Sequence, residues 1–541
     1  MKKLLLIFIS IIIHLFTTAQ SWQDTISRIE KIFARYKPGN PGAQLAISRN
    51  GKVIFSKAWG MADLEHNTPL TTLSITEAGS VSKQFTAAAI LLLEQQGKLS
   101  LNDDVHKYVP ELPDYGYAIT LRHMMQHKSG LKDWGSVVGI AGWPRSTKTY
   151  NNDDALYIIS NQKTLNHRPG DEYLYSNSNY NLFAVIVQRV SGMSLAEFTR
   201  KNIFEPAGMK NTEWRDNFKK IVVNRAIAYS KAGSSYQTNM PNEYVYGNGG
   251  LLTTAEDLLL WCNYYMDGKL GNPSLLEKQT ATTAFNNGVM HRYGAGLFIG
   301  TSRGWKIYTH DGATAGYRAN LDAYPELGLS IAWLSNTSEF DGDTLNVAAT
   351  IANLFMPGKT VLEEVTNENA PALLQVDKNI LDSYAGWYRN SRTGGGVKLS
   401  VQNDKLFATQ VGQLKPVSNE VFAAGNNRVV MKAKGFLFIN GAKDSILFTR
   451  MEDAKTDEKI LNEYTGEYYS EEAEAKFLVL VKNGKLVLLQ KPKNEIYLAP
   501  TYKDGFDSPA GVVYFEREKN KIVSFKVSVG RARNVEFKKI K

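Results

Sequence analysis

The C-terminal part of the chain repeats itself with an offset of 80 residues. Tyr384-Ala-Gly-Trp-Tyr388 recurs as Tyr464-Thr-Gly-Glu-Tyr468, Asn403-Asp-Lys-Leu406 recurs as Asn483-Gly-Lys-Leu486, and Gln410 recurs as Gln490. One offset shared by three matches indicates a duplicated structural unit rather than chance. Each copy contains alternating apolar runs, such as 397–401 and 477–481, separated by turn residues. We therefore predict two small antiparallel β-barrel-like domains, over residues 377–455 and 456–541.

The preceding region has a different pattern, in which strands alternate with helices. Residues 43–59 contain two strand-like runs joined by Asn50-Gly51, a strong hairpin signal. Residues 317–324 and 328–334 are again strand-like, near the other end of the region. A sheet built from both ends, with helices in between, predicts an α+β domain over 20–356 with an antiparallel sheet flanked by helices. The polar, Pro/Gly-punctuated residues 357–376 are typical of a linker.

The first 19 residues have the pattern of an export signal. Lys2 and Lys3 precede the apolar run 4–16, and Thr17-Thr18-Ala19 supplies small residues for cleavage. A run of about 13 residues is too short to span a bilayer, which takes about 20. We expect an exported protein, periplasmic or extracellular, without a transmembrane segment.

Composition limits the classes of partner. Apolar residues make up 43% and charged residues 21% of the chain, as in globular domains. The net charge of +10 is spread along the chain without a basic arm, which argues against a nucleic-acid partner. Cys262 is the only cysteine, so no disulfide forms within the chain, and its apolar surroundings predict a buried, inert thiol.

A serine and a lysine at catalytic spacing begin a long apolar helix. In Glu77-Ala-Gly-Ser80-Val-Ser-Lys83 the pattern becomes helical from Ser80 and continues to a stop at Gly97. Ser80 and Lys83 then lie one turn apart on the same face. A serine hydroxyl needs a base to become nucleophilic, and a neutral amine one turn away supplies one. Burial or positive neighbours favour the neutral amine.

The same spacing occurs at two other places. Ser129 precedes Lys132, and Ser160 precedes Lys163. Neither serine opens a long apolar helix, because Ser129 lies in a predicted turn and Ser160 closes a helical stretch. The context therefore favours Ser80.

Two further segments carry polar groups suited to acyl transfer. Tyr175 and Asn177 lie in a predicted loop before the helical run 180–190, where a phenol can move protons and an amide can hold a carbonyl. The other interpretation is a capped loop with a core tyrosine. His310 and Gly312 begin a strand-like segment in which the Ala313 N–H could form an oxyanion hole with that of Ser80. The alternative there is a surface hairpin with a solvent-facing histidine.

Other chemistries have weaker support. His123 and His127 stand four apart, but the glutamate of a metalloprotease motif is missing between them and no third ligand is apparent, so we expect structural histidines and no metal. Lys128-Ser-Gly130 mimics a β-lactamase strand motif but precedes the tyrosine segment. No Gly-x-Ser-x-Gly elbow and no phosphate-binding loop stand out.

Together these segments resemble the serine β-lactamase-like, penicillin-recognising hydrolases: class C β-lactamases, D-alanyl-D-alanine carboxypeptidases, D-aminopeptidases and esterase relatives. The family's ordered motifs are Ser-x-x-Lys, Tyr-x-Asn and Lys/His-x-Gly. They correspond to Ser80/Lys83, Tyr175/Asn177 and His310/Gly312, and flanking segments at 127–131, 203–209 and 249–254 look similar too. The resemblance implies a β-lactamase/transpeptidase-like domain.

The same resemblance implies roles for these residues. Ser80 would be acylated, Lys83 with Tyr175 would move its proton, and Asn177, His310 and Gly312 would bind substrate. The backbone N–H groups of Ser80 and Ala313 would hold the oxyanion, and no cofactor is implied.

The third motif bears on the substrate, because histidine replaces the lysine of typical β-lactamases at position 310. Together with the two C-terminal β domains, this resembles D-aminopeptidases. We expect a hydrolase of small peptides or amides with D-residues, including peptidoglycan-derived ones. The alternatives are an esterase or β-lactamase on the same scaffold, or a non-catalytic envelope-binding or sensor protein.

Overall fold

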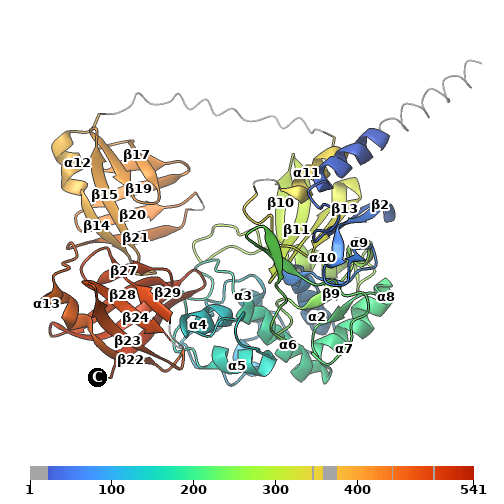
Figure 1. Ribbon diagram of the computed structural model, residues 1–541, viewed down its shortest axis with the longest axis horizontal. Coiled ribbons are helices and arrows are strands. Elements are labelled where there is room, and N and C mark those ends of the chain that lie inside the picture. The colour runs from blue at the N-terminus through green and yellow to red at the C-terminus, as the bar shows by residue number, and fades with distance from the viewer. Residues whose placement is uncertain (1–21, 344–345, 358–374, 442, 491–493, 541) are drawn as a thin grey trace, which may run out of the picture. The chain divides into compact units, whose positions relative to one another are not determined.

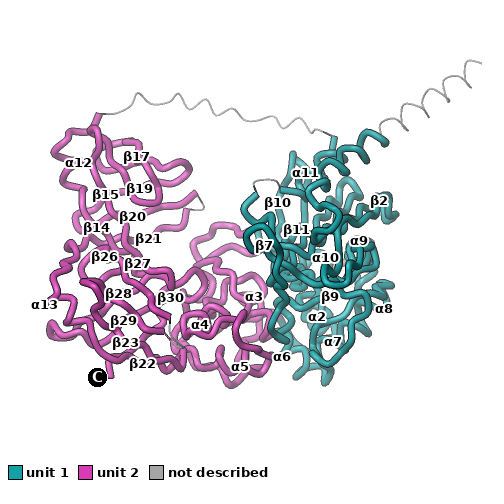
Figure 2. The backbone as a smooth tube through the Cα atoms, viewed as in Figure 1, with its two compact units in different colours: residues 1–100, 183–282, 292–361 teal, residues 101–182, 283–291, 362–541 magenta. Residues whose placement is uncertain are grey.

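A computed structural model describes residues 22–343, 346–357, 375–441, 443–490 and 494–540. These residues form two compact units (Figure 2). Unit 1 comprises 1–100, 183–282 and 292–361, and unit 2 comprises 101–182, 283–291 and 362–541. The predicted export signal 1–19 and nearly all of the predicted linker 357–376 lie outside the described residues.

Unit 1 is built on a six-stranded antiparallel sheet. Its strand order is β10-β11-β12-β13-β1-β2, so strands from both ends of the region lie side by side, as predicted. The Asn50-Gly51 hairpin is confirmed: both residues have positive φ, which suits the turn that joins two antiparallel strands. The strands of the sheet are β1 (Ala43–Arg49), β2 (Lys52–Trp59), β10 (Phe298–Ser302), β11 (Trp305–Thr314), β12 (Tyr317–Tyr324) and β13 (Leu329–Ser335).

Helices cover both faces of this sheet (Figure 1). On one face, the helical residues 22–33 and α11 (Val347–Phe355) share a buried cluster with the sheet that includes Phe33, Ile47, Ile331 and Ile351. On the other face, α9 (Ala255–Met266) contacts β1 and β13. Because both faces are covered, nearly every residue of β1 and β13 is buried rather than every second one.

Unit 1 also contains the segment that holds Ser80. The 3₁₀-helix η1 (Gly79–Ser82) leads into α2 (Lys83–Gln95), which ends before Gly97 as predicted. The others are β3 (Met61–Asp63), β4 (Thr68–Pro69), β5 (Thr76–Glu77), α7 (Leu195–Thr199), the π-turn η3 (Arg200–Phe204), α8 (Glu205–Ala207), β6 (Glu213–Trp214), β7 (Tyr229–Ala232), β8 (Ser235–Thr238), β9 (Leu251–Thr253), α10 (Pro273–Thr280) and η4 (Pro325–Leu327).

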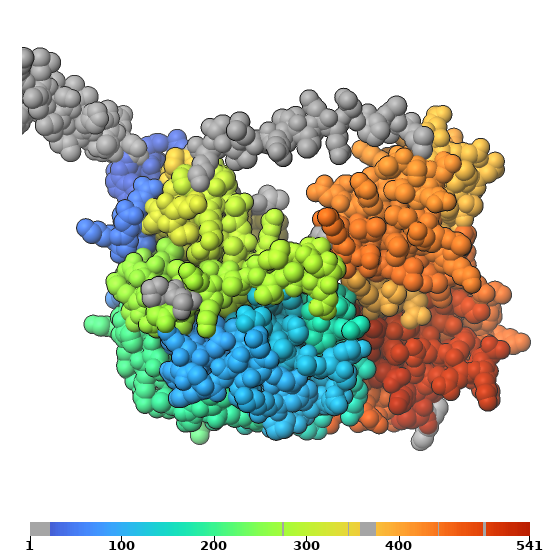
Figure 3. Space-filling model, turned by 180° about the vertical axis from the view of Figure 1, so that it is seen from behind, coloured from blue at the N-terminus to red at the C-terminus, as the bar shows by residue number. Residues whose placement is uncertain are grey.

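Unit 2 combines a helical segment with the two β copies. The helical segment holds η2 (Val105–Lys107), α3 (Leu121–Met125), α4 (Trp134–Ile140), α5 (Asn152–Ser160) and the start of α6 (Asn177–Ser191). It adjoins the second β copy, drawn in red in Figure 3. Gln490 of that copy donates to the carbonyl oxygens of Gly139 and Ile140 at the end of α4. The β copy is thereby anchored to the helical segment.

Both copies form the predicted barrels. In the first copy, β14–β21 close into an eight-stranded antiparallel barrel. In the second, β22–β30 form a nine-stranded sheet whose edge strands β25 and β26 follow each other in the chain. The first copy has α12 (Lys378–Tyr384), β14 (Gly386–Asn390), β15 (Gly396–Gln402), β16 (Lys405–Ala408), β17 (Gly412–Pro416), β18 (Val421–Ala424), β19 (Asn427–Lys432), β20 (Gly435–Ile439) and β21 (Ser445–Met451). The second has α13 (Glu458–Leu461), η5 (Asn462–Tyr464), β22 (Gly466–Ser470), β23 (Ala475–Lys482), β24 (Lys485–Gln490), β25 (Asn494–Tyr497), β26 (Ala499–Pro500), β27 (Gly505–Ser508), β28 (Gly511–Glu518), β29 (Lys521–Val529) and β30 (Ala532–Lys539).

The repeated tyrosines have the same geometry in both copies. The Tyr388 hydroxyl donates to the Tyr384 carbonyl oxygen at 2.8 Å, and the Tyr468 hydroxyl donates to that of Tyr464 at 2.7 Å. The glycine between them has a φ of 141° in each copy. Each copy also opens with a short helix, which the strand-rich sequence pattern did not predict.

Among the described residues, no single helix has the length and apolar character needed to cross a membrane. One bent pair, α6 with residues Leu195–Ala207, meets those two criteria when taken together.

Candidate active site

Ser80 is the accessible residue of a buried segment. All residues from Ser74 to Leu93 are buried except Ser80, which is partly exposed. The serine lies in the 3₁₀-turn η1, whereas the sequence predicted the first turn of the α-helix. Because a 3₁₀-helix has three residues per turn, the side chains at positions i and i+3 eclipse each other. Lys83 Nζ accordingly lies 3.1 Å from Ser80 Oγ.

Lys83 is fully buried and held by a backbone carbonyl. Its exposed fraction is 0%, and its Nζ donates to the carbonyl oxygen of Asn248 at 2.5 Å. Asn248 lies beside the 249–254 segment that resembled the family's sequence. The amine is therefore fixed beside the hydroxyl, at hydrogen-bonding distance for a proton transfer.

The third motif contacts η1 through glycines. A Cβ built on Gly312 would lie 2.1 Å from the Ala78 carbonyl oxygen and 3.1 Å from the Ser80 nitrogen. A Cβ built on Gly79 would lie 2.7 Å from the Ala313 nitrogen. The two backbones therefore touch without an intervening side chain. This contact brings the segments that bear the Ser80 and Ala313 amides together, as an oxyanion hole requires.

His310 is buried and electrically neutral. Its exposed fraction is 2%, which rules out the solvent-facing histidine considered from the sequence. Burial is the main cause that lowers the pKa of His310 to about 4, and a proton on the nearby Lys83 amine lowers it further. The Asp311 carbonyl oxygen lies 2.6 Å from Nδ1, and the Tyr293 hydroxyl lies 3.0 Å from Nε2. Since a carbonyl only accepts, Nδ1 carries the proton and Nε2 accepts from Tyr293.

A buried ion pair supports the strand before Ser80. Arg215 Nε donates to Glu77 Oε2 at 2.8 Å, and both side chains are at most 4% exposed. Glu77 also accepts from the Gly250 amide at 3.2 Å. Because neither charge contacts Ser80 directly, we assign this pair to the support of the η1 turn.

The second motif lies in unit 2, where its surroundings are well defined. Asn177 begins α6, and its backbone N–H donates to Asp133 Oδ2 at 2.8 Å. The Tyr175 ring stacks on the imidazole of His127, with 4.2 Å between ring centroids. His127 Nδ1 accepts from the Ser176 amide at 3.2 Å. His127 therefore has the structural role predicted for it, as a platform for Tyr175.

A hairpin of the second β copy reaches the same tyrosine. The guanidinium of Arg531, in the β29–β30 turn, lies 4.7 Å from the centroid of the Tyr175 ring. The Arg531 carbonyl oxygen accepts from the Asp133 amide at 3.0 Å and from Asn166 Nδ2 at 3.1 Å. The phenol ring therefore contacts both His127 and Arg531.

The competing serine–lysine pairs have other partners. Ser129 Oγ donates to Asn179 Oδ1 at 2.7 Å, and Lys132 forms a buried ion pair with Glu472 at 2.6 Å. Ser160 ends α5, as predicted. Cys262 is buried, and its surroundings raise the pKa of the thiol to about 12, as expected for an inert cysteine.

His123 has a structural role, because it forms a capping box with Thr120 at the start of α3. Within the described ranges, Asp63, Glu65 and His66 are the one group of potential metal ligands close enough to share an ion. They lie on an exposed turn and include none of the predicted site residues.

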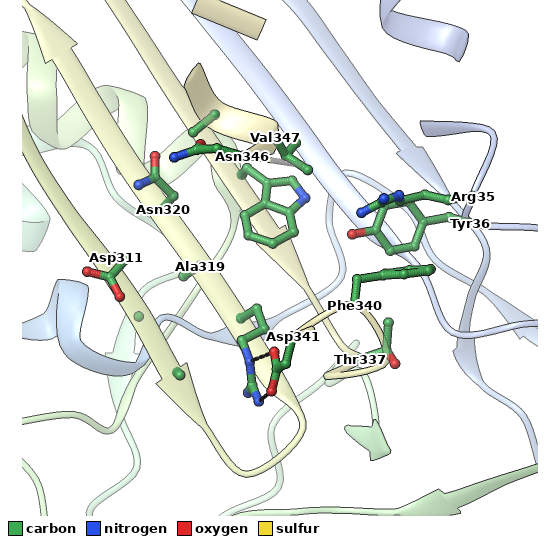
Figure 4. Close-up of a pocket in the computed structure, with 15 residues that line it drawn as sticks. Arg35, Tyr36, Asp311, Ala319, Asn320, Thr337, Phe340, Asp341, Asn346 and Val347 are labelled. Carbon is green, nitrogen blue, oxygen red and sulfur yellow. Dashed lines mark hydrogen bonds and ion pairs between the residues drawn. The ribbon is translucent and has the colours of Figure 1, made fainter. Parts of the chain in front are cut away.

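A cavity of about 430 Å³ lies on the opposite face of the sheet from His310 (Figure 4). Asp311 and Asn320 line it from neighbouring strands, and Arg35 and Phe340 form its other side. Along β11 successive side chains point to opposite faces, so Asp311 points into this cavity while His310 is buried beside Lys83. We therefore place the catalytic chemistry on the Ser80 face.

The comparisons with known proteins agree with this geometry. A family model described as beta-lactamase matches residues 26–354, about three fifths of the chain. The chain belongs to the β-lactamase family. As a member, it is a serine hydrolase of the penicillin-recognising kind.

Relatives of this β-lactamase-family protein include two curated proteins. Penicillin-binding protein 4* of Bacillus subtilis is 28% identical over 76% of this chain and 93% of its own length. The D-aminopeptidase of Brucella anthropi is 24% identical over 94% of this chain and 98% of its own length. Among solved structures, the D-amino acid amidase from Ochrobactrum anthropi SV3 has a similar fold, with a TM-score of 0.52 and 22% identity over 61% of this chain and 98% of that one.

Several supporting residues escaped the sequence analysis. Tyr293 and Arg215 carry no local motif, and they reach His310 and Glu77 only through the fold. Asn248 could have been found, since it directly precedes a segment that resembled the family. Arg531 gives no signal in the sequence beyond a turn glycine before it.

Proposed function

We propose that this protein hydrolyses amide bonds of small D-amino-acid-type substrates through an acyl-enzyme on Ser80. The observation that carries the proposal is the 3.1 Å distance between Lys83 Nζ and Ser80 Oγ at the accessible point of a buried segment. An amine at this distance can accept the hydroxyl proton as the oxygen attacks.

The proposed reaction has two halves. Ser80 Oγ attacks the carbonyl carbon while its proton moves to neutral Lys83, and the developing oxyanion accepts hydrogen bonds from the Ser80 and Ala313 amides. The tetrahedral intermediate collapses, the C–N bond breaks, and the leaving amine takes up a proton. Water then attacks the ester, and the acid is released with regeneration of the serine hydroxyl.

Tyr175 and Asn177 complete the proposal through their order in the family's motifs. Tyr175 is assigned to the transfer of the proton to the leaving amine, and Asn177 to the orientation of the acyl group. His310 is assigned to the substrate-binding strand. Its hydrogen bonds to Tyr293 and Asp311 support a role in positioning the strand in neutral form.

Two observations support D-amino-acid substrates. The relative named D-aminopeptidase aligns with nearly the whole chain, both β copies included. The third motif also contains histidine where typical β-lactamases have lysine, and a neutral histidine offers no positive charge to the carboxylate of a β-lactam. Both features favour an uncharged amide over a penicillin.

The test is hydrolysis of a matched panel by the wild-type protein and by S80A. The panel holds D- and L-phenylalanine amide, D-alanyl-D-alanine, p-nitrophenyl acetate and nitrocefin. We expect kcat/KM to be highest for the D-amide and to fall at least about 10³-fold in S80A. Preference for the ester or for nitrocefin would replace the proposed substrate class, and turnover that persists in S80A would overturn the mechanism.

We propose in addition that the protein is exported and cleaved after Ala19. Intact-mass measurement of protein secreted by a Gram-negative host tests this step. The expected mass lacks residues 1–19, whereas a full-length cytoplasmic product would contradict export.

A further inference from the structure

The first β-barrel contains a chamber that the proposed reaction does not use. A cavity of about 330 Å³ lies inside β14–β21, within the range of about 300–1,000 Å³ that is typical of small-molecule sites. Its walls are mainly apolar, and the side chains that define this barrel chamber are Val397, Leu399, Ala408, Leu414, Phe436 and Phe448. An eight-stranded barrel is just wide enough to hold one small ligand.

The second copy shows why the chamber is open. With the offset of 80 residues, Ala408 corresponds to Leu488 and Val397 to Phe477, and the strand registers agree with both correspondences. Phe477 is buried in the second barrel, where its ring centroid lies 4.8 Å from that of Phe537. The first copy therefore has smaller side chains at two positions where the second has packed core.

One end of the chamber opens into a polar hollow. A wider hollow of about 900 Å³ shares Thr393, Gln410, Asp507 and Val512 with the chamber. These shared residues mark the mouth, where β27 contacts the barrel beside β15 (Figure 1). A ligand can therefore place an apolar body inside the barrel and a polar end in the hollow.

Asp507 gives the mouth its charge. Its neighbour Phe506 points into the core of the second barrel, so Asp507 points outward to the chamber mouth. Within the described part of the chain, its carboxylate has no hydrogen-bond or ion-pair partner, and burial raises its pKa. Arg533 also lines the hollow, but its guanidinium is paired with Glu172 at 2.9 Å. A half-buried carboxylate next to apolar walls favours a cationic partner.

We propose that the first barrel binds a small amphipathic amine, with its apolar body in the chamber and its ammonium group beside Asp507. The contact requires no covalent step. Since all lining residues belong to the two β copies and the adjoining helical segment, the site is separate from Ser80.

The test is calorimetric titration of the full-length protein with 4-phenylbutylamine and with 4-phenylbutyric acid. The two probes share one apolar body and carry opposite charges. We expect the amine to bind and the acid to bind at least about tenfold more weakly. D507N should reduce amine affinity about tenfold, whereas D404N, which changes an exposed aspartate of the same barrel, should leave it unchanged.

Filling the chamber locates the binding. A408L and V397F introduce the side chains that the second copy has at these positions, and we expect either to abolish amine binding while kcat/KM and the melting temperature stay near wild type. Two independent variants guard against a folding defect in one. The proposal would be overturned if the wild type did not bind the amine, or if both filled variants bound it as tightly as the wild type does. Equal affinity of the wild type for amine and acid would also overturn it.

Discussion

Around Ser80, individual residues act through position more than through charge. The Lys83 amine lies 3.1 Å from the Ser80 hydroxyl, and Gly312 has no side chain to separate β11 from η1. His310 makes its hydrogen bonds without a positive charge. The serine–lysine spacing occurs three times in this chain, so spacing alone does not define the site. The short distance to a buried amine and the glycine contact with β11 distinguish Ser80, because the equally buried Lys132 is paired with Glu472 instead of Ser129.

Gly312 tests the proposed oxyanion hole. In G312A the new methyl group would lie 2.1 Å from the Ala78 carbonyl oxygen, so η1 and β11 must separate. We expect kcat/KM to fall by about 10²–10³-fold, the usual effect of losing one oxyanion donor. The control is G300A, whose methyl group would meet only Ile307 at 3.7 Å. Equal activity of G312A and G300A would contradict the assignment.

The lowered pKa of His310 predicts a specific dependence of protein stability on pH. Its pKa is lowered in the folded protein to about 4, while the unfolded chain takes up a proton near pH 6.5. The contribution of neutral His310 to the free energy of unfolding is therefore fully present above pH 6.5. It is lost as the pH falls toward 4, by up to about 3 kcal/mol. Denaturant unfolding of wild type and H310Q over this range measures the difference.

The comparison with H310Q is needed because Asp322 acts in the opposite direction. Burial raises the pKa of Asp322 to about 6, so its contribution is lost as the pH rises from about 4 to 6. Subtracting the H310Q profile removes this effect. If the two profiles run parallel from pH 4 to 6.5, His310 is not the buried neutral group described above.

Among the elements, the β29–β30 hairpin couples a C-terminal barrel to a predicted catalytic residue. Its backbone is fixed by Asp133 and Asn166, and its Arg531 covers the Tyr175 ring. This contact gives the second β copy a role beyond spacing.

Arg531 is accordingly predicted to affect catalysis. A cation over an aromatic ring contributes about 1–2 kcal/mol when it is shielded from water, so R531M should free the Tyr175 ring and lower kcat/KM about tenfold. R531K should retain part of the activity. The control R428M changes an exposed arginine of the first barrel and should have wild-type kinetics. Wild-type activity in R531M would limit the hairpin to a packing role.

The ion pair between Lys132 and Glu472 is predicted to hold the helical segment on the second barrel. Both side chains are at most 5% exposed, so K132M leaves a buried carboxylate without its partner, at a cost of about 3–5 kcal/mol. The double variant K132M/E472L should recover most of that stability. K482M, at an exposed pair, should unfold like the wild type. Thermal unfolding of the four proteins decides, and an unchanged K132M would contradict this role.

At the scale of the whole molecule, local sequence patterns predicted the parts but not their docking. The Asn50-Gly51 turn, the helix after Ser80 and the 80-residue duplication each depend on residues close in sequence, and the fold confirms all three. The tautomer of His310 and the cover over Tyr175 depend on Tyr293 and Arg531. No short pattern encodes these long-range contacts.

The two copies of the duplication differ in the interior of their barrels, which the sequence pattern did not predict. Both copies fold alike, yet the small Ala408 lines a chamber in the first barrel, whereas the equivalent Leu488 packs in the core of the second. Size differences at equivalent positions carry this information, but only after the strand registers show that the positions are equivalent. The chain therefore combines one catalytic scaffold with two barrels of different interior.

The central claim is that Ser80 becomes acylated because Lys83 deprotonates it. The most direct measurement is peptide-resolved mass spectrometry after reaction with a fluorophosphonate. The account predicts one adduct, on the peptide that contains Ser80, and a rate of labelling reduced at least about 10²-fold in K83R, because arginine stays protonated and cannot act as a base. An adduct on another residue, or undiminished labelling of folded K83R, would contradict it.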